Sequence, residues 1–255
     1  MTSLYDIVKI LSRDAAGLGV IKINLSKREF ASKFQLWWPK YKHFSLLSLY
    51  GLCQLWFMYC EKNIRPRYFM YSIIDSYIPF IKVFVIPYLF WFAYMALGLI
   101  YLGIVSKKDY YRLCVFMFGG MCVCYTIYML FPNAQNLRPI ITDDDILSRI
   151  IRHIYATDTN TNVAPSIHVY NSIAVHVALV NCPEFNKEGK FWKYASFVSM
   201  VLISLSTVFI KQHSIKDGIW AAALAFVFYI FIYHLPKWLS TKHFTIPWAK
   251  EATMD

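Results

Sequence analysis

The feature that most constrains this chain is a series of long apolar runs separated by short polar stretches. A helix that crosses a membrane requires about 20 predominantly apolar residues. Only 16% of the 255 residues are charged, whereas soluble domains carry about 25%. We therefore predict an all-α, polytopic membrane protein, a six-transmembrane-helix bundle whose spans are residues 44–60, 78–105, 111–131, 166–182, 191–210 and 218–234.

The same pattern divides the chain into three predicted parts. Residues 1–43 form a cytoplasmic N-terminal tail, residues 44–234 a six-span membrane domain, and residues 235–255 a cytoplasmic C-terminal tail. In the first tail, apolar residues between Leu4 and Leu11 recur at helical spacing beside basic residues. This spacing fits a helix lying on the membrane surface, or one packed under the bundle.

The basic residues predict which way the bundle faces. Of the 26 Lys and Arg, 17 lie on the side of the two tails and 9 lie in residues 61–82, 132–165 and 211–216. By the positive-inside rule both termini are cytoplasmic, and the other segments face outward, as expected in the plasma membrane. The net charge of +11 fits contact with membrane lipids and not with nucleic acid, because no basic stripe lies on a soluble fold. No protein partner is indicated.

Residues suited to covalent catalysis lie in two of the outward segments. His213 and Asp217 are four apart, so they are neighbours if this stretch is helical. A carboxylate beside a histidine fixes its tautomer and stabilises the charged ring, which makes His213 a candidate nucleophile. His168, at the start of the fourth run, is placed to protonate a leaving oxygen.

Residues suited to binding an anion stand beside these histidines in the sequence. Pro165 fits the first turn of a helix, and the free N–H groups at a helix start bind anions, with Ser166 as a further donor. Arg138 can hold a phosphate through its planar guanidinium group. The acids 143–145 could attract a divalent cation, but adjacent acids in a loop are usually solvated, so no metal or other cofactor is predicted. The six cysteines lie in or beside apolar runs and indicate packing, not disulfides.

In order and spacing, these residues resemble the motifs of the type 2 phosphatidic acid phosphatase superfamily. Those motifs are Lys-x6-Arg-Pro, Pro-Ser-Gly-His and Ser-Arg-x5-His-x3-Asp, and the matching segments here are 131–139, 165–168 and 206–217. The resemblance covers about residues 75–234 and agrees with six spans. Pro87, Tyr88 and Trp91 are also similar to a segment of inositol phosphorylceramide synthases.

The resemblance implies a role for each matching residue. His213 forms a phosphohistidine and Asp217 orients it. His168 is the general acid and then the base that activates water. Arg138 and Ser166, with the backbone of the second motif, bind the phosphate, and no metal takes part.

Three positions depart from the family pattern. Phe131 replaces the lysine of the family motif, Ile167 replaces the glycine and Thr207 replaces the arginine. Two phosphate-binding cations are therefore missing. Ile167 and Thr207 are kept in the predicted phosphate site because they occupy motif positions. Lys211, one helical turn after Thr207, is placed to restore one charge. A less positive pocket favours a pyrophosphate, a diester or head-group transfer over a dianionic monoester.

The resemblance therefore implies a metal-independent membrane lipid phosphatase that hydrolyses a lipid phosphomonoester or pyrophosphate through phosphohistidine. Two alternatives stay open. One is a phosphotransferase that passes a lipid head-group phosphate to an alcohol, because water and an alcohol attack the same intermediate. The other is a non-catalytic lipid binder or transporter, against which the retained His168, His213 and Asp217 argue.

Overall fold

The structure of the chain is a computed structural model that describes residues 39–236 and residue 238. The chain forms two compact units, Met1–Ser45 and Leu46–Asp255. The helix predicted in the N-terminal tail and most of the C-terminal tail lie outside the described residues. The elements are η2 (Lys42–Leu47), α3 (Ser48–Asn63), β1 (Tyr68–Phe69), α4 (Ile73–Tyr77), η3 (Lys82–Phe84), α5 (Val85–Val105), α6 (Lys107–Leu130), β2 (Asn133–Ala134), α7 (Ile146–Thr157), α8 (Ile167–Asn181), α9 (Pro183–Lys187), α10 (Lys190–Phe209), α11 (Ile215–Tyr229) and η4 (Ile230–His234).

Four of the helical segments are long and apolar enough to cross a membrane. They are Lys82–Val105, Lys107–Leu130, Lys190–Phe209 and Ile215–His234. Between 17% and 56% of the most apolar window of each is buried inside the protein, so each leaves apolar surface for lipid. These segments indicate an integral membrane protein and confirm the prediction of a mostly helical chain with membrane-type helices.

The prediction of six spans is wrong for the described residues. The first predicted span forms α3, with 16 residues, and the fourth forms α8, with 15 residues. At 1.5 Å per residue these helices measure about 24 and about 22 Å, short of a hydrocarbon core about 30 Å thick. The 3-10 helix η2 joins α3 directly, so α-helical geometry begins only at Ser48, and α8 ends before Cys182, whose backbone is extended.

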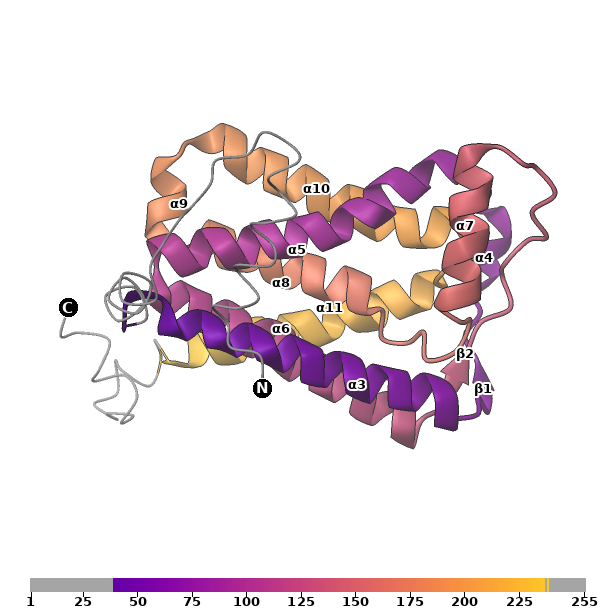
Figure 1. The fold of residues 1–255 in the computed structure, drawn as a ribbon, viewed down its shortest axis with the longest axis horizontal. Helices are drawn as coiled ribbons and strands as arrows, with labels where there is room; N and C mark the ends of the chain where they lie inside the picture. Colours follow the sequence, from indigo (N-terminus) through magenta and orange to yellow (C-terminus); the bar gives the residue numbers. More distant parts are fainter. Residues whose placement is uncertain (1–38, 237, 239–255) are drawn as a thin grey trace, which may run out of the picture. The chain divides into compact units, whose positions relative to one another are not determined.

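The apolar sequence of α8 is explained by burial within the protein. In the second unit, α8 packs against α5, α6, α10 and α11 (Figure 1). Small residues let two neighbours approach closely. A Cβ at Gly120 of α6 would lie 2.0 Å from the Tyr170 ring, and a Cβ at Gly98 of α5 would lie 2.6 Å from Val175. Hydropathy alone does not distinguish such a buried helix from a lipid-facing one.

The connections between helices meet at one end of the second unit. There β1 pairs in parallel with β2, joining Tyr68 to Asn133. Phe209, at the end of α10, accepts a hydrogen bond from the N–H of Ile81, ahead of α5. The starts of α8 and α11 lie at the same end, because the N–H of Ser166 donates to the Asp217 carbonyl over 3.1 Å. The two predicted motif segments are therefore brought together.

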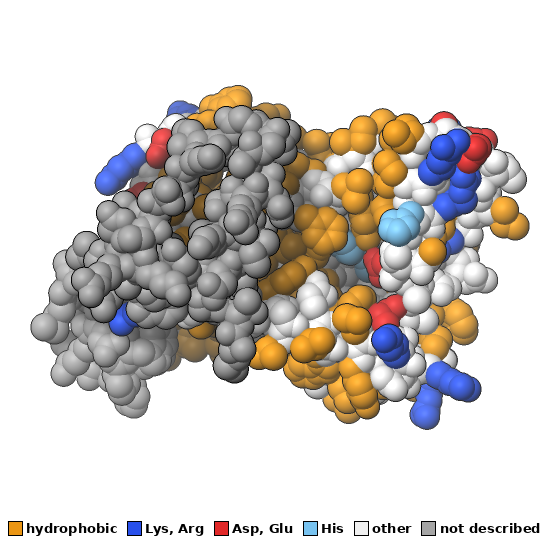
Figure 2. Space-filling view, viewed as in Figure 1, with side chains coloured by type: hydrophobic (Ala, Val, Ile, Leu, Met, Phe, Trp, Pro, Cys, Tyr) orange, Lys and Arg blue, Asp and Glu red, His pale blue; other side chains and the backbone are white. Residues whose placement is uncertain are grey.

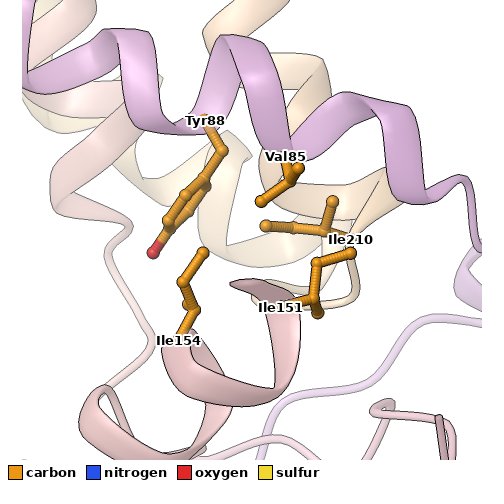
Figure 3. Packing of buried hydrophobic residues seen from close by; sticks show 5 residues of the cluster. All are labelled: Val85, Tyr88, Ile151, Ile154 and Ile210. Atoms are coloured by element: carbon orange, nitrogen blue, oxygen red, sulfur yellow. The ribbon is translucent and has the colours of Figure 1, made fainter. Parts of the chain in front are cut away.

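Helix α7 closes this end with an apolar stripe. Asp145 caps its start by accepting from the N–H groups of Leu147 and Ser148. Ile151 and Ile154 pack in one buried cluster with Val85, Tyr88 and Ile210 (Figure 3). Full burial of such a side chain stabilises the fold by about 1.5–3 kcal/mol. The packing fixes the loop after α7 beside α5.

Candidate active site

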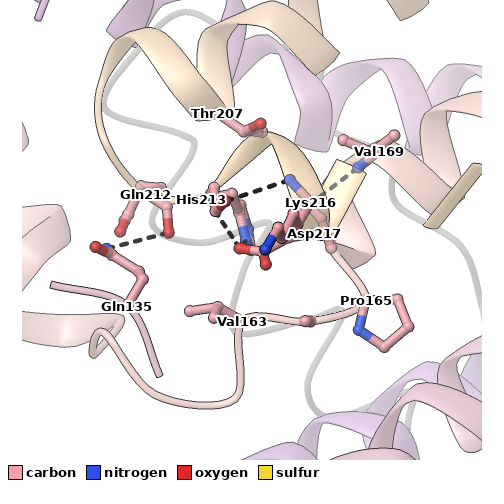
Figure 4. Close-up of polar contacts among 12 residues, drawn as sticks. Gln135, Val163, Pro165, Val169, Thr207, Gln212, His213, Lys216 and Asp217 are labelled. Atoms are coloured by element: carbon pink, nitrogen blue, oxygen red, sulfur yellow. Dashed lines mark hydrogen bonds and ion pairs between the residues drawn. The ribbon is translucent and has the colours of Figure 1, made fainter. Parts of the chain in front are cut away.

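His213 and Asp217 form a buried pair at the start of α11. Ser214 caps this helix, and the Asp217 carboxylate accepts from the Ser214 N–H over 2.9 Å. The same oxygen lies 3.4 Å from Nδ1 of His213 (Figure 4). Asp217 is fully buried, so its charge is directed at the imidazole ring. The contact at Nδ1 leaves Nε2 as the nitrogen available for chemistry.

His168 lies across from this pair, in the first turn of α8. Its ring centroid is 5.7 Å from that of His213. Tyr88 and Trp91 of α5 hold the ring, at centroid distances of 4.6 and 4.3 Å. The structure thus brings together the three residues predicted to be catalytic, His168, His213 and Asp217, from two separate helix starts.

The turn before α8 is held by buried side chains. Asn133 accepts at Oδ1 from the N–H groups of Val163 and Ala164, each over 2.8 Å. Ser166 caps α8 by accepting from the Val169 N–H over 3.5 Å, and it is fully buried. Its hydroxyl therefore serves the helix start, whereas Ile167, the next residue, lines the cavity described below.

The third motif segment, residues 206–217, is held in a similar way. Gln135 donates to the carbonyls of Lys211 and Gln212 (Figure 4). Gln212 and His213 donate their N–H groups to the Thr207 carbonyl, and the Thr207 hydroxyl donates to the carbonyl of Ser204. Thr207, predicted in the phosphate site, therefore shapes the turn through its backbone, and its own hydroxyl bonds within α10.

Arg138 is bound to the protein by its guanidinium group. Its terminal nitrogens donate to three backbone carbonyls, at Tyr155, Asp158 and Thr159, over 2.7 to 3.1 Å. One of them also donates to Oε1 of Gln212, and the guanidinium carbon lies 4.5 Å from the centre of the Tyr155 ring. Arg138 therefore anchors the loop after α7, and it is absent from the residues that line the cavity.

Lys211 is also engaged away from the histidines. Its Nζ donates to the carbonyls of Asp75 over 2.9 Å and of Ile78 over 2.5 Å. Burial lowers the pKa of this amine, and the charge of Asp75 opposes the shift. Lys211 ties the segment after α4 to the turn before α11, a role the spacing of the motif did not reveal.

This placement predicts that Lys211→Ala lowers stability. Two carbonyls would lose a charged donor, and hydrogen bonds to charged groups contribute about 1.5–3 kcal/mol. Thermal unfolding in detergent should show a lower midpoint for Lys211→Ala and no change for Lys216→Ala, whose side chain is exposed. Loss of activity in Lys211→Ala at an unchanged midpoint would instead place its charge in the phosphate site.

A cavity of about 370 Å³ joins the two histidines to an apolar opening. Its polar lining includes His168, His213 and Gln212. Its apolar lining includes Phe57 of α3 and Phe92 of α5, and Phe92 is 51% exposed. Figure 2 shows histidine and acidic side chains recessed beside hydrophobic ones on this face. The arrangement suits a molecule with one polar and one apolar end.

Four cavity residues were not predicted as site residues. The Tyr88 hydroxyl donates to the Asp158 carboxylate over 3.1 Å, and Nε2 of Gln212 lies 3.5 Å from the same hydroxyl. Nε1 of Trp91 is buried without a hydrogen-bond partner. Burial raises the pKa of the Asp158 carboxyl, and the neighbouring His213 opposes this shift. Tyr88 and Trp91 carried a weak sequence signal, but Asp158 and Gln212 carried none.

The described acidic clusters lie away from the histidines. Asp143 and Asp145 contact Lys82, and Asp144 pairs with two arginines, Arg149 and Arg152. One further cluster has a metal-ligand spacing: the ligand atoms of Asp109, Cys182 and Glu184 lie within 4.8 Å of one another, at the opposite end of α8. Arg112 pairs with Asp109 there over 2.9 Å.

Comparisons of the chain with protein-family models, with curated proteins and with solved structures find no match.

Proposed function

We propose that this protein is a membrane enzyme that cleaves a lipid phosphoester by forming phosphohistidine on His213. One observation carries the proposal: two histidine rings lie 5.7 Å apart in a cavity whose exposed lining is mostly apolar. A phosphorus atom between the rings would have a nucleophile on one side and a proton donor on the other once His168 is protonated, and burial with the neighbouring His213 lowers the pKa of His168 in the absence of substrate. The resemblance to the type 2 phosphatidic acid phosphatase superfamily supports the same chemistry.

The proposed reaction has two steps. Nε2 of His213 attacks phosphorus, the bond to the leaving oxygen breaks, and His168 protonates that oxygen. His168 then takes a proton from water or an alcohol, which attacks the phosphohistidine and restores His213. Asp217 stabilises the charged imidazole in both steps. Nε1 of Trp91 and Nε2 of Gln212 are the neutral donors we assign to the phosphate oxygens.

The charge of the cavity favours a particular substrate. Among the described residues that line it, none is Lys or Arg. Arg138 and Lys211, predicted to bind phosphate, donate to protein oxygens. A dianionic monoester would be desolvated there without a cation, whereas a phosphodiester carries one negative charge. The lining therefore favours a diester over a monoester or pyrophosphate, and a diester is the substrate of the second candidate function, transfer of a head-group phosphate to an alcohol.

The function is tested with purified protein in detergent and with a chelator present. The substrates are phosphatidic acid, a polyprenyl pyrophosphate and diester phospholipids, each with and without a soluble alcohol. We expect cleavage of at least one lipid without added metal, and a diester cleaved faster than the monoester. A lack of cleavage across the panel, or activity only with added metal, would refute the proposal.

The orientation of the site is part of the proposal. Counted with α3 and α8 also running between the two ends of the bundle, the excess of basic residues on the side of the tails, 17 against 9, supports cytoplasmic termini and a site on the outer face of the plasma membrane. An impermeant thiol reagent applied to intact cells should label Asn160→Cys and leave Lys250→Cys unlabelled. Labelling of Lys250→Cys alone would reverse the orientation.

A further inference from the structure

Asp158 is a carboxylate in the cavity that the proposed reaction does not use. It follows α7 and lines the cavity with His168 and His213. Its side chain accepts from the Tyr88 hydroxyl, and its backbone carbonyl accepts from Arg138 over 2.8 Å. The carboxylate is therefore held in one position by two other elements of the fold.

The loop after Asp158 is fixed as well. Glu61, at the end of α3, accepts from the side chains of Thr161 and Asn162 over 3.2 and 2.8 Å, and also from that of Thr159. Asp158 and Glu61 are close enough for each charge to affect the other. The cavity is thus rigid and acidic around Asp158.

The charge of Asp158 has little compensation within the described cavity lining. It is the only carboxylate among those lining residues, which include no Lys or Arg. Part of it is offset by His213, by the Tyr88 hydroxyl and by the Arg138 guanidinium, whose hydrogen bonds go to backbone carbonyls and to Gln212 and not to the Asp158 carboxylate. A buried carboxylate is stable when a hydrogen-bond donor or a cation neutralises it. A ligand that carries both a hydrogen-bond donor and a positive charge would neutralise the Asp158 carboxylate.

We infer that Asp158 recognises the head group of a lipid phosphodiester by binding a primary ammonium group. The inference rests on the proposed function and names its substrate class. The ammonium donates a charge-assisted hydrogen bond to the carboxylate, while the phosphate lies between His168 and His213.

The inference is tested on short-chain diester lipids that share acyl chains and differ only in the head group. The head groups carry a primary ammonium, a quaternary ammonium without donors, or a neutral hydroxyl. The protein should cleave the first about 10- to 100-fold faster than the other two, as expected for one hydrogen bond to a charged group. Equal rates, or a preference for the hydroxyl or quaternary head group, would overturn the assignment of a primary ammonium.

Asp158→Asn tests the residue itself. The amide keeps an acceptor for the Tyr88 hydroxyl but loses the charge, so the rate for the ammonium lipid should fall to that of the other diesters and the preference should disappear. The matched control is Asp143→Asn, an exposed acid that contacts Lys82 outside the cavity, which should keep the preference. An equal fall in all rates for Asp158→Asn would overturn the role in recognition.

The thermal midpoint of Asp158→Asn distinguishes a role in recognition from a purely structural role. Because burial raises the pKa of Asp158, its ionised form destabilises the folded state increasingly as pH rises from the usual aspartate value through the raised one. Asp158→Asn should therefore unfold at a temperature no lower than the parent protein at pH 7.5. A lower midpoint would assign Asp158 to the fold and overturn the inference.

Binding separates the inference from the proposed function. His213→Ala should not turn the lipids over, so its thermal midpoint can be measured with each of them. Preferential stabilisation by the ammonium lipid, without cleavage of any lipid by the parent protein, would retain the inference and refute the proposed function. Cleavage without a head-group preference would retain the proposed function and refute the inference. If the parent protein shows no cleavage and His213→Ala shows no preference, both are refuted.

Discussion

His213→Ala should abolish cleavage, with a fall in kcat of at least about 10⁴-fold, because removal of a covalent nucleophile leaves only binding and oxyanion contacts. The fold should survive the change. The His213 side chain has one described hydrogen bond, to Asp217, and its backbone N–H still donates to the Thr207 carbonyl. Asp217 keeps the Ser214 N–H that caps α11.

The experiment combines a rate with a chemical trap. A substrate labelled at phosphorus and quenched in alkali should leave an acid-labile label on the parent protein and none on His213→Ala. His153→Ala is the matched control, because His153 also lines the cavity but is exposed on α7 and has no described contact with Asp217. Full activity in folded His213→Ala, or equal losses in both variants, would refute the assignment of the nucleophile.

The cluster proposed to be catalytic was predictable in part because the spacing of His213 and Asp217 is local. A spacing of four residues placed His213 beside Asp217, and the helix-start pattern placed His168 one residue into α8. What joins the two segments was not predictable. The Ser166 N–H donates to the Asp217 carbonyl, and Asn133 and Gln135 hold the two turns from a third segment. Such contacts depend on tertiary structure and leave no periodic pattern in the sequence.

The number of spans was overestimated for a physical reason. Apolar composition reports that a helix avoids water, but both lipid and protein provide a dry environment. In α8, Tyr170 and Val175 pack on glycines of α6 and α5, so its apolar residues face protein. The sequence carried the evidence only as Gly98 and Gly120, whose partners are known once the helices are packed.

The contacts of the charged motif residues were also not predictable from the sequence. Spacing placed Arg138 and Lys211 near the histidines in sequence, but their donors reach carbonyls of segments far along the chain, including Asp75 and Ile78. A motif gives the position of a cationic residue in the sequence but not the acceptor that its side chain binds. Asp158, in a polar loop without periodicity, became a candidate only when α7 positioned it against Tyr88.

Asp217→Asn should reduce kcat by about 10⁴-fold, comparable to the loss when the carboxylate of a Ser-His-Asp triad becomes an amide. The replacement is nearly isosteric, and one amide oxygen can still accept from the Ser214 N–H and cap α11. Its effect should therefore fall on the histidine. With its oxygen in this position the amide carries no charge, so it does not stabilise the imidazolium as the carboxylate does.

The matched control is Asp75→Asn. Asp75 is a second buried carboxylate at the start of α11, where it accepts from the Ser214 hydroxyl over 2.6 Å and from the Ile215 N–H over 2.9 Å. It has no described contact with His213, so its loss should lower the thermal midpoint and leave the rate per folded molecule within about tenfold, because electrostatic effects weaken with distance. The two variants thus separate a carboxylate that orients a nucleophile from one that holds a helix. A larger kcat loss in Asp75→Asn than in Asp217→Asn would reverse these roles and remove the support for His213 as the group that attacks phosphorus.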